Sequence, residues 1–311
     1  MRFRRKTSLA AVAAAGALVA LVLAGCSTSN PTASPSSSAA AAKSSQEPIV
    51  VGSAAFPENE ILAEIYAQAL TGAGIPATTH LDIGQRPAYL KAMKEGSIDL
   101  VPEYSGNLLQ FYNKDTTDKS SAGVFAALQK AIPSSLEVLP EAEAQDRDSY
   151  NVTKEFAKKY GLVSLGDLTK APQPLIVGGN PELGQRPYGL PGLKSVYGVT
   201  STLKPISDSG GPLTIKALQD GTIQVADIFT TTPAITQFVT LKDPKNMVLA
   251  QNIVPLIRKS KASAKVKSTL DAVSAKLTTK ALIAMNGKSS GSAKESSAQI
   301  AKEWLSQEGL D

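Results

Sequence analysis

The sequence predicts an α/β protein built from two similar lobes, with a ligand cleft between them. Two observations support this prediction. Short apolar strands alternate with helical segments along the chain from residue 48 onward, which is typical of an α/β architecture. In addition, segment 90–105 (LKAMKEGSIDLVPEYS) recurs 125 residues later as segment 215–230 (IKALQDGTIQVADIFT).

Both copies of this repeat read as a helix, a glycine that ends it, a buried strand, and an aromatic residue followed by a small polar one. Gly96 corresponds to Gly221, and Tyr104 corresponds to Phe229. The carboxyl ends of strands in open α/β sheets face the ligand crevice, so each lobe is expected to offer one aromatic ring there. The alternative is coincidence, because the order helix–glycine–strand is common in α/β proteins.

The other elements are predicted from apolar spacing. A strand at 49–51 precedes a helix at 58–70, for which Pro57 suits the first turn. His80 is expected to be exposed on a second strand, and Trp304 is expected to lie in the core of a helical tail. The remaining predicted segments are 77–83, 89–94, 98–101, 136–139, 156–160, 175–177, 215–218, 223–228 and 264–309.

Composition excludes several classes of function. The formal net charge of +5 comes largely from four basic residues within the first 25, so the rest of the chain is close to neutral and gives no electrostatic reason to expect nucleic acid as a partner. One Cys excludes a disulfide framework and a CxxC metal site, and one His argues against zinc and Ser/His chemistry. The chain also lacks a GxSxG motif and a P-loop. We therefore expect no enzyme activity, no metal and no cofactor.

Residues 1–25 read as an export signal, with a basic start and an apolar run that is short for a membrane span. The run ends in Leu23-Ala24-Gly25-Cys26, which resembles a bacterial lipobox. In this interpretation the mature protein begins at Cys26, which carries diacylglycerol and an added acyl chain such as palmitate. The alternative is an ordinary signal peptide followed by a chance cysteine. Residues 26–47 are small, polar and proline-containing, and are expected to form a flexible linker to the lipid anchor.

Several motifs, in the right order, resemble those of osmoprotectant-binding proteins, the glycine betaine, choline and carnitine receptors of ABC importers. Residues 52–62 (GSAAFPENEIL) are similar to the family's GSxxFxExxIL opening. Residues 96–106 (GSIDLVPEYSG) match its G-x-ID-L-x-PEYTG segment closely. Residues 189–198 and Phe229-Thr230-Thr231 resemble two further motifs, and the similarity extends over most of residues 48–258.

The resemblance implies a type II periplasmic-binding-protein fold, with lobe 1 formed by 48–150 and 250–311 and lobe 2 by 151–249. It also implies that the protein captures a quaternary-ammonium compatible solute such as glycine betaine on the extracytoplasmic face of the cell membrane. The implied partners are this small-molecule ligand and an ABC permease with its ATPase. The alternatives are a binding protein for another small polar metabolite and, less favoured, a lipid-anchored enzyme.

The candidate ligand-binding residues follow from the chemistry of such a solute. A quaternary ammonium has no hydrogen-bond donor and is held against aromatic faces. The matched motifs point to rings at the predicted cleft, while Tyr188 and Tyr197 are weaker candidates because glycine- and proline-rich loops often carry surface tyrosines. Amides after the first strand, or the Arg86 guanidinium, would bind a carboxylate; alternatively Arg86 forms a salt bridge with Glu58 or Glu103. The full set is Ser53, Phe56, Arg86, Tyr104, Tyr150, Phe229 and Thr230.

Two departures from the family pattern affect the predicted site. Thr232 stands where the family has an aspartate, so a cleft carboxylate is expected to be missing. Gln251 and Asn252 stand near the position of a cage tyrosine in many members, so a complete aromatic cage is not expected.

Overall fold

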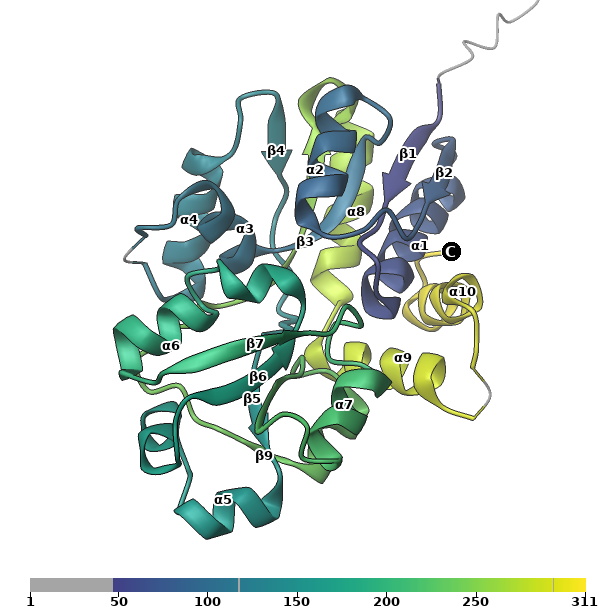
Figure 1. Cartoon of the computed structure of the whole chain (residues 1–311). Helices are drawn as coiled ribbons and strands as arrows, with labels where there is room; N and C mark the ends of the chain where they lie inside the picture. The colour runs from purple at the N-terminus through teal and green to yellow at the C-terminus, as the bar shows by residue number, and fades with distance from the viewer. Residues whose placement is uncertain (1–46, 117, 293) are drawn as a thin grey trace, which may run out of the picture. The chain divides into compact units, whose positions relative to one another are not determined.

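The computed structural model describes residues 47–116, 118–292 and 294–311, so Cys26, the predicted export signal and nearly all of the predicted linker lie outside the described residues. The described chain is a mixed α/β protein with two five-stranded sheets, each belonging to one lobe (Figure 1). The predicted two-lobed α/β fold is confirmed.

The sheet of lobe 1 has the strand order β2-β1-β3-β10-β4. β1 runs parallel to β2 and β3, whereas β10 returns from late in the chain and runs antiparallel to β3, with Ile253 opposite Tyr104. Apart from its C-terminal helices, lobe 1 consists of β1 (Ile49–Gly52), α1 (Pro57–Gly72), β2 (Ala77–His80), α2 (Arg86–Glu95), β3 (Leu100–Tyr104), α3 (Ser105–Tyr112), α4 (Ser121–Ala131), β4 (Leu136–Val138), β10 (Ile253–Arg258) and the 3-10 turn Lys259–Lys261.

The sheet of lobe 2 has the order β7-β6-β8-β5-β9, with β6 parallel to both β7 and β8. Its elements are β5 (Tyr150–Val152), α5 (Lys154–Tyr160), the 3-10 helix Leu165–Lys170, β6 (Leu175–Gly179), the 3-10 helix Pro181–Gly184, α6 (Leu190–Tyr197), β7 (Ser201–Pro205), α7 (Pro212–Gln219), β8 (Val225–Asp227), the 3-10 helix Pro233–Gln237 and β9 (Val239–Thr240).

The internal repeat corresponds to the same unit in each sheet. α2 and β3 form the first copy and α7 and β8 the second, with Gly96 and Gly221 at positive φ after the helices. In each copy an isoleucine packs on a glycine of the parallel neighbour strand. A Cβ at Gly52 would lie 2.5 Å from Ile98 Cδ1, and one at Gly178 would collide with Ile223 Cδ1 in the same way. The two lobes therefore repeat this packing detail as well as the order of elements.

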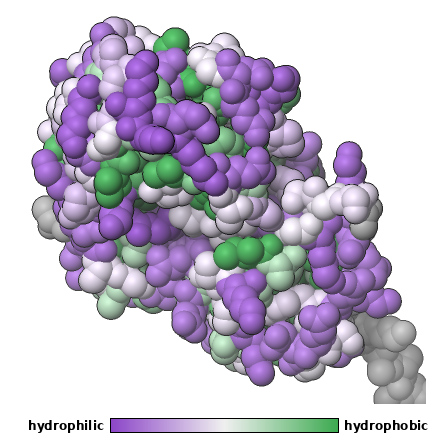
Figure 2. All heavy atoms as spheres, turned by 90° about the horizontal axis from the view of Figure 1, so that it is seen from below, coloured by the Kyte–Doolittle hydropathy of each residue, from purple (hydrophilic) through white to green (hydrophobic). Residues whose placement is uncertain are grey.

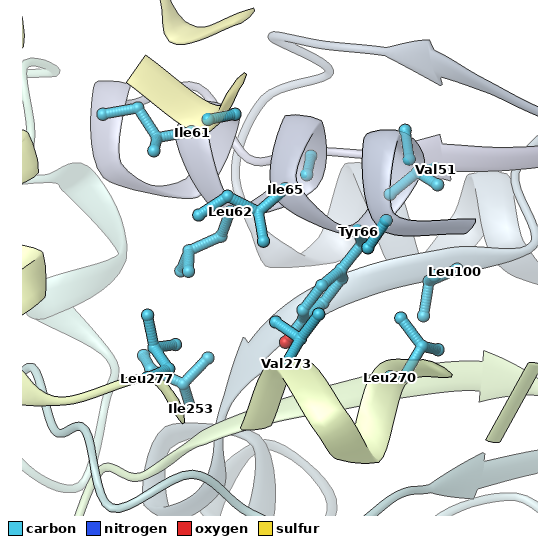
Figure 3. Close-up of a cluster of buried hydrophobic side chains, with 14 of the residues drawn as sticks. Val51, Ile61, Leu62, Ile65, Tyr66, Leu100, Ile253, Leu270, Val273 and Leu277 are labelled. Carbon is cyan, nitrogen blue, oxygen red and sulfur yellow. The ribbon is translucent and has the colours of Figure 1, made fainter. Parts of the chain in front are cut away.

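Three helices near the C-terminus complete lobe 1: α8 (Ala264–Lys276), α9 (Thr279–Ser290) and α10 (Ser297–Glu308). Figure 3 shows Tyr66 of α1 reaching toward Val273 of α8 in this core, where each large side chain contributes about 1.5–3 kcal/mol by burial. Trp304 lies in the same core and His80 is exposed, as predicted. The strand predicted at 77–83 ends at His80, and Asp82 then takes a positive φ of 56°.

The chain crosses between the sheets twice, after β4 and after β9. The two crossings lie side by side, because Gln145 pairs antiparallel with Asn252. The face seen in Figure 2 is largely hydrophilic, with hydrophobic residues in small separate groups. No helix among the described residues is long and apolar enough to span a bilayer.

Candidate functional site

A cavity of about 70 Å³ is lined by residues of both lobes and of the first crossing. Strands β1, β3, β6 and β8 all end close to it, as expected for the carboxyl edge of α/β sheets. Tyr104 and Phe229, the two aromatic residues of the repeat, both line it, which confirms the prediction that they face one crevice from opposite lobes. The lining is Ala54, Phe56, Gln85, Arg86, Tyr89, Tyr104, Asn107, Asp146, Asp148, Asn180, Glu182, Leu183, Arg186, Tyr188, Asp227 and Phe229.

The Phe56 ring lies close to two other aromatic rings of the cavity lining, one from each lobe. The Phe56 ring centroid lies 6.0 Å from that of Tyr104 and 5.5 Å from that of Phe229. Phe56 occupies the N-cap position of α1 in extended conformation, with Pro57 following it in the first turn, so the helix start fixes the backbone at this residue. Rings from two lobes thus form an apolar, electron-rich wall.

Arg86 is engaged by Glu103 in a buried, bidentate pair. Its Nε donates to Oε1 and its Nη2 to Oε2, both at 2.9 Å, and the Tyr89 hydroxyl donates to the same carboxylate at 2.8 Å. This is the internal salt bridge that the sequence left open as an alternative. Arg86 still lines the cavity, but its charge is neutralised within lobe 1.

Three predicted site residues lie beside the cavity without lining it. Ser53 Oγ accepts from the Asp82 amide at 2.9 Å, and the Tyr150 hydroxyl donates to the Tyr188 carbonyl at 2.6 Å within the core of lobe 2. Thr230 Oγ1 donates to Asp146 Oδ1 at 3.1 Å. Each of them therefore holds a neighbouring segment in position.

Three aspartates line the cavity, so the expectation that a cleft carboxylate would be missing is wrong. Asp146 and Asp148 lie on the first crossing, and Asp227 ends β8, two residues before Phe229. The expectation failed because the carboxylates come from these two segments and not from position 232. Gln251 and Asn252 are buried and bonded to Asn107 and the Ala142 carbonyl, outside the lining.

Asp148 and Asp227 are two buried carboxyl groups that lie close enough to affect each other's pKa. Burial raises the pKa of Asp227 well above its ordinary value, and the Asp148 charge raises it further. Burial also raises the pKa of Asp148, although the Asn107 amide donates to it at 2.6 Å and opposes the shift. Each of the two carboxyl groups therefore makes ionisation of the other less favourable.

Glu58 joins the two lobes behind the aromatic wall. It is 4% exposed, and its carboxyl accepts from the Tyr104 hydroxyl at 2.9 Å, from Thr231 Oγ1 at 2.6 Å and from Asn286 Nδ2 at 2.6 Å. Burial raises the pKa of Glu58 and, with the adjacent Glu58 charge, that of Asp146. The sequence suggested Glu58 only as a partner for Arg86.

The loop 184–192 contributes two residues that sequence reasoning ranked low or missed. Tyr188 is buried and lines the cavity, and the Arg186 guanidinium lies 5.3 Å from the Phe111 ring centroid of α3 in lobe 1. The loop is tightly turned, because a Cβ at Gly189 or Gly192 would collide with a backbone carbonyl oxygen.

Comparisons with known proteins agree with this geometry. The family model for the substrate binding domain of ABC-type glycine betaine transport systems matches residues 47–307. Glycine betaine-binding protein YehZ of Escherichia coli (strain K12) is 26% identical over 228 residues, covering 68% of this chain and 74% of that protein. The glycine-betaine-binding protein of Pseudomonas aeruginosa is 27% identical over 225 residues, which cover 68% of this chain and 72% of that protein.

Among solved structures, that of a glycine betaine/carnitine/choline ABC transporter superposes with a TM-score of 0.66. It is 22% identical, and the match covers 84% of this chain and 99% of that chain. This likeness shows the fold. Because the family model covers most of the sequence, and because the motifs and the cavity between two lobes agree with it, the chain belongs to the family of substrate-binding domains of ABC-type glycine betaine transport systems.

Proposed function

We propose that this protein binds a methylated ammonium solute of the betaine and choline class between its lobes and delivers it to an ABC permease. The observation that carries the proposal is the meeting of Phe56, Tyr104 and Phe229, from both lobes, in a cavity that also holds buried carboxyl groups. The relatives described above are glycine betaine-binding proteins, which supports the same class of ligand.

The three rings would hold the methylated nitrogen, because cation–π attraction contributes about 0.5–2 kcal/mol per ring when water is excluded. Carboxylate groups in the cavity lining would add to this attraction. For a solute that carries a carboxylate, we propose Arg186 as its partner, since Arg86 is already bound by Glu103. A ligand that contacts both lobes would stabilise the closed form, with the two chain crossings as the hinge.

Binding is proposed to leave the solute chemically unchanged, so the protein would act as a receptor and not as an enzyme. The test of ligand class is calorimetric titration with glycine betaine, choline and carnitine. Phe229→Ala is expected to weaken binding roughly 2- to 30-fold, the range that corresponds to one ring. Tyr160→Ala removes a ring that packs on Phe156 in lobe 2, outside the cavity lining, and should bind as the wild type does. Failure of all three solutes to bind would contradict the proposal.

We also propose that Cys26 is lipidated and that residues 26–47 tether the folded part to the extracytoplasmic face of the membrane. The support is the lipobox-like sequence that precedes the single cysteine. Mass spectrometry of the membrane fraction should find a mature chain that begins at a lipid-modified Cys26. Cys26→Ser should release the protein from the membrane, and an intact N-terminus at Met1 would contradict the proposal.

A further inference from the structure

A cluster of three hydrogen-bonded side chains joins the two lobes. Glu58 of α1 and Asn286 of α9 belong to lobe 1, and Thr231 follows β8 of lobe 2. Thr231 Oγ1 donates to Glu58 Oε2 at 2.6 Å. Asn286 Nδ2 donates to the same Glu58 oxygen at 2.6 Å and to Thr231 Oγ1 at 3.0 Å. Each of the three side chains therefore contacts the other two, and two of these contacts cross the lobe boundary.

The cluster is largely buried and lies apart from the cavity. Glu58 is 4% exposed and Thr231 is 1% exposed, and α9 packs against the 3-10 helix Pro233–Gln237 that follows Thr231. Within the part of the chain that the structure describes, the cavity lining includes none of the three residues. Hydrogen bonds that are shielded from water are electrostatically stronger than exposed ones. The cluster can therefore hold the lobes together without touching a bound solute.

A small rotation of the lobes is enough to break the cluster. The Thr231 amide also donates to Asp146 Oδ1 at 3.0 Å, on the first crossing, so the cluster lies beside the hinge. Its own hydrogen bonds are 2.6–3.0 Å long, and such bonds are lost once the two atoms separate beyond about 3.5 Å. Opening that moves Thr231 by about 1 Å relative to α9 would therefore disconnect the lobes at this point.

We propose that Glu58, Thr231 and Asn286 form a latch that holds the lobes closed, and that Asn286 is a positioning residue that sets the affinity for every solute alike. This inference rests on the proposed function and concerns the closing of the same site. If a solute binds tightly only to the closed form, its apparent dissociation constant is the intrinsic constant divided by the closed fraction. The Tyr104 hydroxyl donates to Glu58 Oε1 while its ring lines the cavity, so the latch is one side chain away from the solute.

The first measurement is the dissociation constant of glycine betaine and of choline by calorimetry. Asn286→Ala removes both amide hydrogen bonds but no group of the cavity lining. It should weaken the binding of both solutes by the same factor, about 2- to 12-fold, which corresponds to one net hydrogen bond. Gln68→Ala is the matched control, because Gln68 Nε2 donates to the Ala298 carbonyl at 3.0 Å between two helices of lobe 1. It should leave both constants unchanged.

A double-mutant cycle assigns the effect to the latch. Thr231→Val removes the hydroxyl from the side of lobe 2, keeps the shape of the side chain, and should weaken both solutes at least as much as Asn286→Ala does. Without this hydroxyl, the Asn286 amide has lost its short bond across the lobe boundary. Adding Asn286→Ala to Thr231→Val should therefore weaken binding by less than about 2-fold more. If the two factors multiply in full, the residues act independently and the latch is overturned.

Single-molecule fluorescence energy transfer measures the opening of the lobes directly. Lys91 of α2 and Lys216 of α7 take equivalent positions in the repeat, one on each lobe, and their side chains are 73% and 72% exposed. Fluorophores are attached to Lys91→Cys and Lys216→Cys in a full chain that also carries Cys26→Ser. At any fixed concentration of glycine betaine, including zero, Asn286→Ala should lower the ratio of closed to open time about 2- to 12-fold.

The outcomes separate the latch from the proposed function. The latch is overturned, while the proposed function stands, if Asn286→Ala leaves the closed-to-open ratio or both dissociation constants unchanged, or if it weakens only one solute. If neither solute binds, the proposed function fails, and the ratio without solute decides on the latch; a chain that then never closes overturns it too. Should Asn286→Ala not fold, Thr231→Val provides the same measurements from lobe 2.

Discussion

Replacing Glu58 by alanine is expected to destabilise the protein strongly, because one buried carboxyl serves three donors from different segments. The change leaves the Tyr104 hydroxyl, Thr231 Oγ1 and Asn286 Nδ2 without their common acceptor. Tyr104 and Thr231 are buried, so each unpaired group costs about 1–3 kcal/mol, whereas Asn286 is only partly buried and can turn toward water. Removing the carboxyl also removes its own burial cost. The net loss in the free energy of unfolding is expected to be about 2–4 kcal/mol.

Glu58→Gln is the matched variant, since it keeps the length of the side chain and one acceptor oxygen. Burial raises the pKa of Glu58 above its ordinary value of 4.5, which favours the protonated form that glutamine resembles. We therefore expect Glu58→Gln to lower the free energy of unfolding by less than about 1 kcal/mol at pH 5, which is the cost of one altered hydrogen bond.

The same pKa shift makes stability depend on pH. Between pH 4.5 and the raised pKa, the folded protein binds more protons at Glu58 than the unfolded chain does, so its contribution to stability falls as the pH rises. Glu58→Gln should not show this fall in stability with rising pH, because glutamine does not titrate. Glu303 provides a control of opposite sign, because its hydrogen bond with Lys288 lowers the pKa of Glu303, and the stability that it contributes is lost as the pH falls.

Urea-induced unfolding is followed by circular dichroism at a series of pH values. Linear extrapolation then gives the free energy of unfolding of each variant and its dependence on pH. The reasoning is refuted if Glu58→Ala unfolds within about 0.5 kcal/mol of the wild type, which is the level of an ordinary surface substitution. It is also refuted if Glu58→Gln keeps the pH dependence of the wild type.

Two further predictions concern the packing around the cavity. Arg86→Ala should cost about 3–5 kcal/mol in urea-induced unfolding, because it leaves the Glu103 carboxylate buried without its cation; unchanged stability would mean that the pair is not structural. Gly106→Ala in α3 should lower the midpoint of thermal unfolding, since its Cβ would lie 2.7 Å from the Leu249 Cβ. Gly287 in α9 has open space around the position of a Cβ, so Gly287→Ala should raise that midpoint and increase the free energy of unfolding by about 0.5–1 kcal/mol. Equal effects of the two alanines would contradict the predicted clash.

The features that the sequence predicted well depend on patterns that repeat or are local. The spacing of Gly96, Gly221, Tyr104 and Phe229 was enough to predict two similar lobes and a shared crevice, because a helix, its glycine cap and the following strand are encoded within about 16 residues. Trp304 was predicted to be buried from the apolar spacing of its own helical segment.

The polar part of the site could not be predicted in this way, because it depends on pairings between distant segments. Glu58 is 173 residues from Thr231 in the sequence, and their hydrogen bond forms only when the lobes are in place. Likewise, Arg86 could bind a ligand or Glu103, and only the position of β3 beside α2 decides between them. Tyr188 was undervalued because loop composition does not reveal which side of a turn faces inward.

The position of Trp304 has a consequence for following how the protein unfolds. It is the single tryptophan of the sequence, and it lies in the core that α1, α8 and α10 form in lobe 1. Its fluorescence therefore records the melting of one lobe, whereas circular dichroism records the backbone of both. If the two signals change together, the contacts across the cleft make the lobes unfold as one cooperative unit. If they change separately, each lobe is an independent folding unit, and a bound solute should bring the two transitions together because it stabilises only the joined state.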